Sequence, residues 1–293
     1  MAIAWKNSQN DALPPGNPLH GYCLQAVLGA GNFGITYLAE HELCKTRHVV
    51  KEFKPNNALR MDDGSVRPKS EGGRKIFDWG LVSFFEEARL LRSFRHPNVV
   101  RVSDVFRANG TAYFVMPYLE GETLHRWIAR NPRPCRAELL NIVIPLLEGL
   151  KYIHGKGVLH RDIKPENVFL LTNGNPLLID FGSARQAIGQ KSKVLTQVFT
   201  PPFAAVEQYS TTGEKTAALD LYSLGVCIYL AITRFLPDEA SSRVEKDSLP
   251  KLAGSDFEAH FGRGFLSAVD KSLALWPKDR FQNGLEMQQA LLG

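Results

Sequence analysis

The stretch HRDIKPENVFLL, residues 160–171, places an Asp, a Lys and an Asn within six positions, just before an apolar run. Charged residues gather in solvated loops of many proteins, so Asp162, Lys164 and Asn167 become informative only if the chain supplies partners for them. One partner follows after a short apolar segment that ends in IDFG, because this motif contains Asp180.

These four side chains have complementary chemistry. The carboxylate of Asp180 and the amide oxygen of Asn167 are hard oxygen ligands of the kind that Mg²⁺ prefers. Asp162 can orient a hydroxyl and accept its proton, and Lys164 can neutralise charge on a moving phosphoryl group. The set therefore predicts phosphoryl transfer with the assistance of Mg²⁺, or alternatively Mn²⁺.

A glycine-rich turn lies near the start of the chain. The motif GAGNFG places Gly29, Gly31 and Gly34 in a GxGxxG pattern, which lets backbone N–H groups approach phosphates. The following ITYLAEHE has the character of a strand, whereas a dinucleotide-binding fold requires a helix there. No GK[ST] follows, so a Walker A loop is excluded as well. The pattern fits a β-hairpin that covers phosphates.

Lys51 lies in the apolar strand context VVK, downstream of this hairpin. A lysine on a half-buried strand needs an anionic partner, although a solvent-facing lysine at a sheet edge is common. Glu86 and Glu87, on the first predicted helix, are the candidates. Adjacent helical residues point about 100° apart, so only one of the two can face Lys51.

Strand-like segments dominate the first part of the chain, at 21–54 and 99–118. One helix is predicted over 81–94 from its apolar spacing. The polar, glycine-rich segment at about 55–80 is interpreted as an insertion or long loop.

Helices dominate the second part of the chain, with clear helical spacing at 137–157 and 217–233. Short apolar strands are predicted at 158–160, 168–171 and 176–180. The pattern indicates an α+β fold with two lobes that meet near Tyr118–Gly121, and clefts between lobes are common ligand sites.

Composition sets wider limits. The 293 residues are 44% hydrophobic and 22% charged, which leaves room for a sizeable core. A net charge of +5 gives only a weak bias towards acidic partners, and we expect no nucleic-acid partner. The cysteines form no CxxC pair and no His cluster has metal-ligand spacing, which predicts a reduced compartment without structural zinc. They are Cys23, Cys44, Cys135 and Cys227.

The first twenty residues lack the apolar centre of a signal peptide. The most apolar run, 217–233, is short for a bilayer span and contains Asp220, so a buried core helix is the better interpretation. We therefore expect a cytoplasmic location and no membrane segment.

In chain order, the motifs GAGNFG, VVK, FFEEA before HPN, VMPY, HRDIKPEN and DFG resemble the protein kinase superfamily, and specifically the bacterial eukaryotic-like serine/threonine protein kinases. The resemblance covers roughly residues 21–291 and rests on the ordered set, which is far more specific than any single motif. It implies a two-lobed protein kinase fold. The implied domains are a polar N-terminal arm at 1–20, a small antiparallel-sheet lobe with one main helix at 21–117, and a larger, mainly helical lobe at 118–293 with an activation segment at 180–207.

The resemblance also implies individual roles. Glu87 is the helical glutamate that pairs with Lys51. Thr200 helps to hold the side chains of Asp162 and Lys164, while Asp162 orients a Ser or Thr hydroxyl of a protein substrate. ATP is bound by residues of the glycine-rich hairpin, of the strand above adenine and of the hinge: Leu28, Gly29, Gly31, Phe33, Gly34, Val49, Lys51, Met116, Pro117 and Leu119.

Three positions depart from the family pattern. Val49 replaces the usual Ala above adenine, and Pro117 loses only an N–H that adenine does not use. Val206 stands where the family has proline in Ala-Pro-Glu, which removes a fixed φ angle from the turn. Glu207 of that motif keeps its expected partner Arg280.

Two further inferences come from the resemblance. Asp220 is expected to accept backbone hydrogen bonds from the loop that carries Asp162. Arg161, just before Asp162, marks kinases that are regulated through the activation loop. We expect Thr196 to be phosphorylated, in a transient homodimer, and its phosphate to be bound by Arg161 and Arg185.

Two alternatives to an active protein kinase stay open. One is a pseudokinase that serves as a binding scaffold, which Val206 keeps in consideration even though every catalytic position is filled. The other is a phosphotransferase that acts on small molecules, such as an antibiotic kinase. Such enzymes resemble this chain around Asp162 but lack the activation segment that ends at Glu207.

Overall fold

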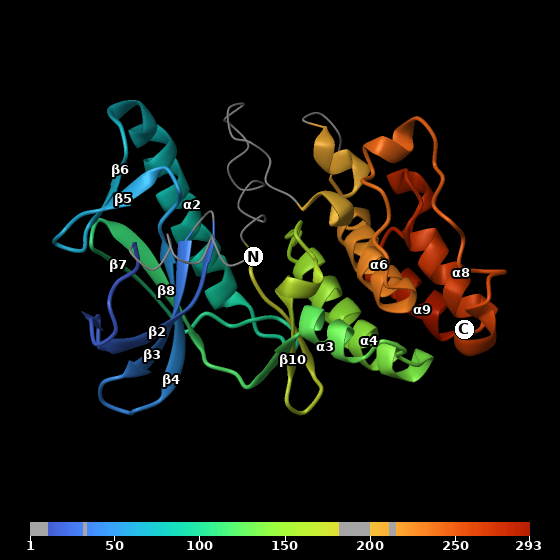
Figure 1. The fold of residues 1–293 in the computed structure, drawn as a ribbon, viewed down its shortest axis with the longest axis horizontal. Coiled ribbons are helices and arrows are strands. Elements are labelled where there is room, and N and C mark those ends of the chain that lie inside the picture. Colours follow the sequence, from blue (N-terminus) through green and yellow to red (C-terminus); the bar gives the residue numbers. More distant parts are fainter. Residues whose placement is uncertain (1–10, 32–33, 182–199, 211–214) are drawn as a thin grey trace. The chain divides into compact units, whose positions relative to one another are not determined.

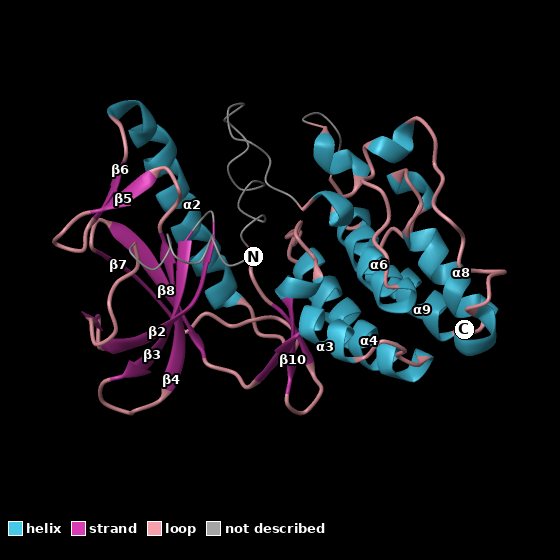
Figure 2. Ribbon diagram, in the orientation of Figure 1, coloured by secondary structure: helices cyan, strands magenta, loops and turns pink. Residues whose placement is uncertain are grey.

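The computed structural model describes residues 11–31, 34–181, 200–210 and 215–293. The chain divides into two compact units. Unit 1 comprises Met1–Arg95 and Val100–Leu119, and unit 2 comprises His96–Val99 and Glu120–Gly293. Figure 2 shows strands as the main elements of unit 1 and helices as those of unit 2.

Unit 1 is built on a six-stranded antiparallel sheet with the strand order β1-β2-β3-β4-β8-β7 (Figure 1). Its strands are β1 (Pro18–Leu19), β2 (Tyr22–Gly31), β3 (Gly34–His41), β4 (Arg47–Phe53), β7 (Asp104–Ala108) and β8 (Thr111–Pro117). Side chains alternate between the two faces of each strand, so the sheet buries a different set of residues on each face.

One face of this sheet buries an aliphatic and tyrosine-rich cluster. Its members are Leu13, Leu19, Tyr22, Leu24, Ile35, Tyr37, Ala39, Val50, Phe106, Tyr113 and Val115. Helix α2 (Arg74–Ser93) covers the opposite face (Figure 1). Aromatic rings make the contact between them. Phe84 of α2 lies 5.6 Å from Phe53 and 5.0 Å from Phe114, measured between ring centroids.

The segment at 55–80 is more ordered than the sequence pattern predicts. It contains the hairpin of β5 (Ala58–Arg60) and β6 (Val66–Pro68), the 3₁₀ helix η1 (Glu71–Gly73) and the first turns of α2. The prediction that the helix starts at residue 81 is wrong, because α2 starts at Arg74. Gly80 interrupts the apolar helical spacing of α2 in the sequence. The glycine is nevertheless required, because a Cβ there would lie 2.7 Å from the ring of Phe53.

Unit 2 is mainly helical. The described helices are α3 (Leu124–Arg130), α4 (Arg136–His154), α6 (Ala218–Thr233), α7 (Glu258–Phe261), α8 (Arg263–Ser272) and α9 (Gly284–Leu292). The described 3₁₀ helices are η2 (Pro165–Asn167), η3 (Pro201–Phe203), η4 (Val206–Tyr209), η5 (Ser242–Val244) and η6 (Pro277–Asp279). A small antiparallel sheet, in the order β11-β10-β9, consists of β9 (Gly121–Thr123), β10 (Val168–Leu171) and β11 (Pro176–Leu178).

Helix α6 is buried along almost its whole length, which confirms the prediction of a core helix over the most apolar run. A helix that is apolar on every side must be surrounded by protein or lipid. In the described residues, no helix combines the length and apolar character that a membrane span requires.

Two predicted strands differ from the structure. Residues 158–160 form no strand, because the backbone N–H of His160 and that of Arg161 both donate to the carboxylate of Asp220 instead of a neighbouring strand. The strand predicted from residue 99 starts only at Asp104, as β7; Val99 makes no more than an isolated bridge to Leu178.

Candidate active site

The β10–β11 hairpin brings Asn167 and Asp180 to the same end of the small sheet in unit 2. Val168 pairs with Leu178, and the N–H of Ile179 donates to the carbonyl of Asn167 at 3.0 Å. Asn167 thus lies directly before one strand and Asp180 directly after the region paired with it. The backbone of Asp180 has φ 58°, a left-handed conformation that Asp adopts more readily than most residues.

Three of the predicted catalytic side chains and the predicted metal ligand Asn167 are in direct contact. Lys164 Nζ lies 2.8 Å from Asp162 Oδ2 and donates to Thr200 Oγ1 at 2.8 Å. The Thr200 hydroxyl donates in turn to Asp162 Oδ1 at 3.1 Å. Asn167 Nδ2 donates to both the carbonyl and the Oδ2 of Asp162, at 2.8 and 2.9 Å. Asp162 is therefore held through both carboxylate oxygens.

The donor set fits a hard divalent cation. Both hydrogen atoms of the Asn167 amide are used for Asp162, which directs Oδ1 of the amide away from that carboxylate. Asp180 adds a carboxylate at the same end of the β10–β11 hairpin. Oxygen ligands of this type suit Mg²⁺, which keeps several waters and takes one or two carboxylates in sites that bind phosphates.

The loop before Asp162 is anchored by the fully buried carboxylate of Asp220. It accepts from the N–H groups of His160 and Arg161 at 2.9 and 2.7 Å, and His154 Nε2 lies 2.8 Å from it. Burial opposes ionisation of Asp220, but His154 and these N–H groups outweigh it and hold the pKa below its usual value. These bonds also hold Arg161 at φ 67°, a strained value for a bulky residue.

The expected Glu207–Arg280 pair is present and bidentate, with N–O distances of 2.8 and 3.1 Å. Both side chains are buried. Arg280 also donates to the carbonyl groups of Ala274 and Leu275 and lies over the ring of Tyr222. The turn at Val206 forms the short helix η4 in the absence of proline.

Gln208 is a site-supporting residue that sequence analysis missed. Its Nε2 donates to the carbonyl of Arg161 at 2.9 Å, and its Oε1 accepts from the N–H of Ala205 at 3.1 Å. It thus ties η4 to the loop before Asp162. A buried glutamine next to Glu207 has no signature in the local sequence pattern, because its partner is far away along the chain.

Of the predicted phosphate-binding residues, Arg161 is described by the structure, whereas Arg185 and the predicted phosphorylation site Thr196 lie outside the described residues. Phe33 of the glycine-rich hairpin also lies outside them. Burial lowers the pKa of the Arg161 guanidinium, and Asp220 counteracts this only in part. Within the described part of the chain, its buried Nε has no hydrogen-bond partner. Lys215 lies close enough to Arg161 that burial and this second positive charge lower the Lys215 pKa.

In unit 1, the glycine-rich hairpin is formed by β2 and β3, with Gly31 opposite Gly34. Gly34 must be glycine, because a Cβ there would lie 1.9 Å from the carbonyl oxygen of Glu52 on β4. Added Cβ atoms at Gly29 and Gly31 would meet no atom of the described residues within 4 Å, so within that part of the chain both positions offer open backbone to a ligand. Leu28 is exposed beside them.

Lys51 lies on the face of the sheet that α2 covers, and Glu87 lies on α2 itself. Lys51 Nζ lies 5.8 Å from the ring centroid of Phe114, and this ring packs on Phe84 of α2. Glu87 is 1% exposed on the buried face of α2. The Glu86 side chain is 45% exposed and pairs with Arg89 at 3.2 Å. The geometry therefore favours Glu87 as the partner of Lys51.

The predicted adenine-binding residues follow from the pairing of β4 with β8. Val49 lies opposite Met116, and the chain leaves β8 at Pro117. The N–H of Tyr118 donates to the carbonyl of Arg47 at 3.2 Å, which keeps the segment beside β4. Leu119 is exposed at the end of unit 1.

Comparison with known proteins places these motifs in one family. The family model described as "Protein kinase domain" matches residues 22–280. Serine/threonine-protein kinase D of Synechocystis is 31% identical over 93% of this chain and 52% of its own length. Serine/threonine-protein kinase PknA of Nostoc is 28% identical over 92% of this chain and 46% of its own length. The chain thus spans about half the length of these relatives.

A solved structure shows the same fold. The apo form of PpkA-294 superposes with a TM-score of 0.85 at 35% identity, over 96% of this chain and 99% of that chain. The predicted fold class, one antiparallel-sheet lobe with a main helix and one mainly helical lobe, is confirmed. The chain belongs to the protein kinase domain family.

Proposed function

We propose that this chain is an ATP-dependent serine/threonine protein kinase that transfers the γ-phosphoryl group of ATP to a Ser or Thr hydroxyl. The observation that carries the proposal is the contact cluster of Asp162, Lys164, Asn167 and Thr200. It combines a carboxylate, a cation and an amide oxygen, held by one another, which is what phosphoryl transfer requires.

Asp162 would orient the attacking hydroxyl and accept its proton. Thr200 and Asn167 limit the rotation of the Asp162 carboxylate, so that less of its freedom must be lost when a substrate binds. Lys164 lies beside the same carboxylate and would stabilise negative charge on the transferred group. When bound at Asn167 and Asp180, Mg²⁺ would neutralise charge on the ATP phosphates.

The residues of unit 1 would bind the nucleotide. The open backbone at Gly29 and Gly31 suits phosphate groups, and Lys51 adds a positive charge on the next strand but one. Glu87 would hold Lys51 in place. Adenine would be bound by Val49, Met116, Pro117 and Leu119. Leu28 and Phe33, from the glycine-rich hairpin, are expected to contribute to ATP binding.

The choice of a protein substrate rests on two features of unit 2. Lys164 within HRDIKPEN is the form that resembles serine/threonine kinases. The segment that ends at Glu207 is fastened to the core of unit 2 by Arg280 and to the Asp162 loop by Gln208. The relatives named above are serine/threonine-protein kinases. A cytoplasmic location belongs to the same proposal and is supported by four free cysteines.

Regulation by phosphorylation of Thr196 is a further part of the proposal. Arg161 is 8% exposed and carries a buried Nε without a partner in the described residues, and Lys215 lies close to it. A phosphate with about −1.5 to −2 charges would relieve the repulsion between these cations and gain about one to three charge-assisted hydrogen bonds. Arg185 would be a third cation, and a transient homodimer would allow autophosphorylation.

The experiment incubates the purified chain with labelled ATP and Mg²⁺, with a generic protein substrate and separately with small alcohols. We expect phosphoserine or phosphothreonine on protein and none after Asp162→Asn. ADP release that depends on small alcohols, without labelled protein, would indicate a small-molecule phosphotransferase; nucleotide binding without any transfer would indicate a pseudokinase. Mass spectrometry of the autophosphorylated chain, and the activity of Thr196→Ala, test the regulatory site.

A further inference from the structure

Glu52 is a buried carboxylate directly next to Lys51 on β4. It is 0% exposed, although unpaired carboxylates are almost never buried in this way. Successive side chains of a strand point to opposite faces, so Glu52 lies on the face of the sheet that Lys51 does not use. That face holds the tyrosine-rich core cluster of unit 1.

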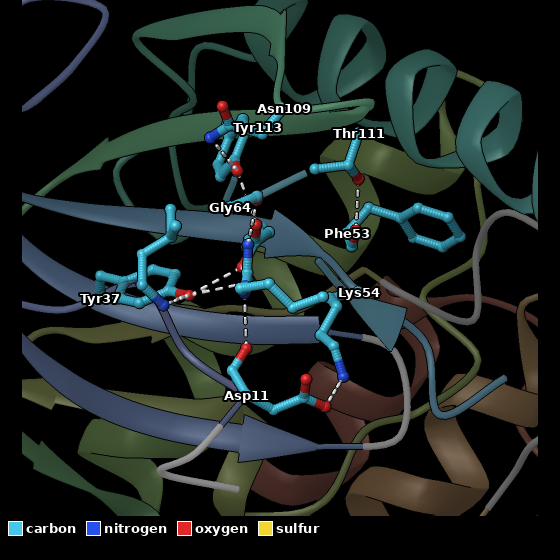
Figure 3. A network of polar contacts seen from close by, with 11 residues as sticks. Asp11, Tyr37, Phe53, Lys54, Gly64, Asn109, Thr111 and Tyr113 are labelled. Atoms are coloured by element: carbon cyan, nitrogen blue, oxygen red, sulfur yellow. Dashed lines mark hydrogen bonds and ion pairs between the residues drawn. The ribbon is translucent and has the colours of Figure 1, made fainter. Parts of the chain in front are cut away.

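Two tyrosines from the strands on either side of β4 donate to this single carboxylate (Figure 3). The hydroxyl of Tyr37 on β3 donates to Oε2 at 2.7 Å, and that of Tyr113 on β8 donates to Oε1 at 2.6 Å. Tyr113 is also the direct pairing partner of Glu52 in the sheet. Glu52 therefore links the three adjacent strands at the residue next to Lys51.

Arg60 supplies the counter-charge from the β5–β6 hairpin. Its Nη2 donates to Glu52 Oε2 at 2.5 Å, and its side chain is 8% exposed. Burial disfavours the charged guanidinium, but the hydrogen bond and charge of Glu52 outweigh burial and raise the Arg60 pKa. Burial and the Glu52 charge likewise raise the pKa of Tyr37 and of Tyr113, so both tyrosines stay protonated donors.

The network also fastens the segment that precedes the family match. Arg60 Nε donates to the carbonyl of Asp11 at 2.7 Å, and the N–H of Leu13 donates to the Tyr37 hydroxyl at 3.1 Å. Lys54, the first residue after β4, forms an ion pair with Asp11 (Figure 3). The protein kinase match starts only at residue 22, so these contacts join Asp11 and Leu13, which precede the match, to residues inside it.

We propose that Glu52, held by Tyr37, Tyr113 and Arg60, is a positioning residue that fixes β4 between its two neighbours and thereby fixes Lys51. A one-residue slip of a strand turns every side chain to the other face, and smaller displacements move them out of place. A carboxylate bonded to both flanking strands opposes such movement at the residue beside Lys51. The nucleotide readout of this inference rests on the proposed function, whereas the backbone readout does not.

The test compares two buried arginines with the same kind of partners. Arg60 bonds to a carboxylate and lies 3.5 Å from the hydroxyl of Tyr37; Arg243 in unit 2 bonds to Asp247 and to the hydroxyl of Tyr222. Arg60→Ala and Arg243→Ala should both lower the melting temperature. Arg60→Ala and, as a separate variant, Glu52→Gln should each weaken ATP binding by about tenfold at a temperature where all variants are folded. Arg243→Ala should leave ATP binding unchanged at that temperature.

A double-mutant cycle shows whether Glu52 acts through Lys51. In the Lys51→Ala background, Glu52→Gln should change the ATP dissociation constant by less than about twofold, because the side chain that it positions is gone. An undiminished effect in that background would overturn the inference. Tyr37→Phe and Tyr113→Phe each keep the ring and remove the hydroxyl that donates to Glu52, together with the hydrogen bond that this hydroxyl accepts from Leu13 or Asn109. These two variants test the inference if Glu52→Gln fails to fold.

Amide hydrogen exchange in 47–53 gives a reading that needs no nucleotide. Exchange there should rise by about tenfold in Glu52→Gln and Arg60→Ala, and stay unchanged in Arg243→Ala. If wild type binds no ATP, the proposed function fails and the exchange data alone decide the positioning role. Unchanged exchange in β4 would refute it.

Discussion

Replacement of Arg280 by Ala tests a buried, bidentate ion pair of unit 2. The substitution leaves the Glu207 carboxylate buried without its two charged hydrogen bonds, and it removes the bonds of Arg280 to Ala274 and Leu275. Breaking a buried pair by removing one partner costs about 3–5 kcal/mol. Total stabilities are about 5–15 kcal/mol, so a large part of the folding free energy would be lost.

The expected change in melting temperature follows from this free energy. For 150–250 residues, each kcal/mol corresponds to about 2–4 °C, so Arg280→Ala should lower the melting temperature by about 6–20 °C. Differential scanning calorimetry measures this shift. Arg130→Ala is the matched control, because Arg130 forms an exposed pair with Glu122 that should contribute less than about 1 kcal/mol.

Two outcomes distinguish the pair from a general effect of losing an arginine. Arg280→Lys keeps the charge but not the fork geometry, so it should recover only part of the loss. If Arg280→Ala shifts the melting temperature no more than Arg130→Ala does, the reasoning from burial and geometry is refuted.

Four other substitutions test the site itself. Asp162→Asn and Asp180→Asn should each abolish phosphoryl transfer while the circular dichroism spectrum stays that of wild type; near-normal transfer by either folded variant would contradict its role. Lys51→Ala should leave the melting temperature within about 2 °C of wild type while weakening ATP binding, and a large thermal shift would show that Lys51 is part of the structural core. Asp220→Asn tests linkage to pH. Because the folded-state pKa of Asp220 lies below 3.8, its contribution to stability is present above about pH 3.8 and is lost as the pH falls further. Urea unfolding between pH 5 and pH 3 should therefore show a steeper loss of stability in wild type than in Asp220→Asn, and equal slopes would exclude Asp220 as the titrating group.

The sequence by itself determined the family and the fold class. Glycines, charged residues and prolines at fixed spacing are local requirements of turns and ligand contacts, so they can be recognised without coordinates. The buried helix α6 was equally accessible, because apolar residues on every side of a helix leave no other environment.

The start of α2 and the absence of a strand at 158–160 could not be predicted from the sequence pattern. Gly80 interrupts the apolar period of α2 and reads as a breaker, but the nearby ring of Phe53 requires it. Residues 158–160 have a strand-like composition, yet the N–H groups of His160 and Arg161 bond to Asp220, about sixty residues further along the chain. The periodic spacing of apolar residues reflects contacts within one helix or strand, so it carries no information about partners that are distant in the sequence.

Some of the buried charged contacts could be found only in the folded structure. From sequence geometry, Glu86 and Glu87 were equal candidates, and packing of α2 on the sheet buries Glu87. The role of Glu52 had no sequence signal at all, because its partners Tyr37, Tyr113 and Arg60 come from three different strands. A buried charge is stable only where its partners converge in space, and residues far apart in the sequence meet only in the folded chain.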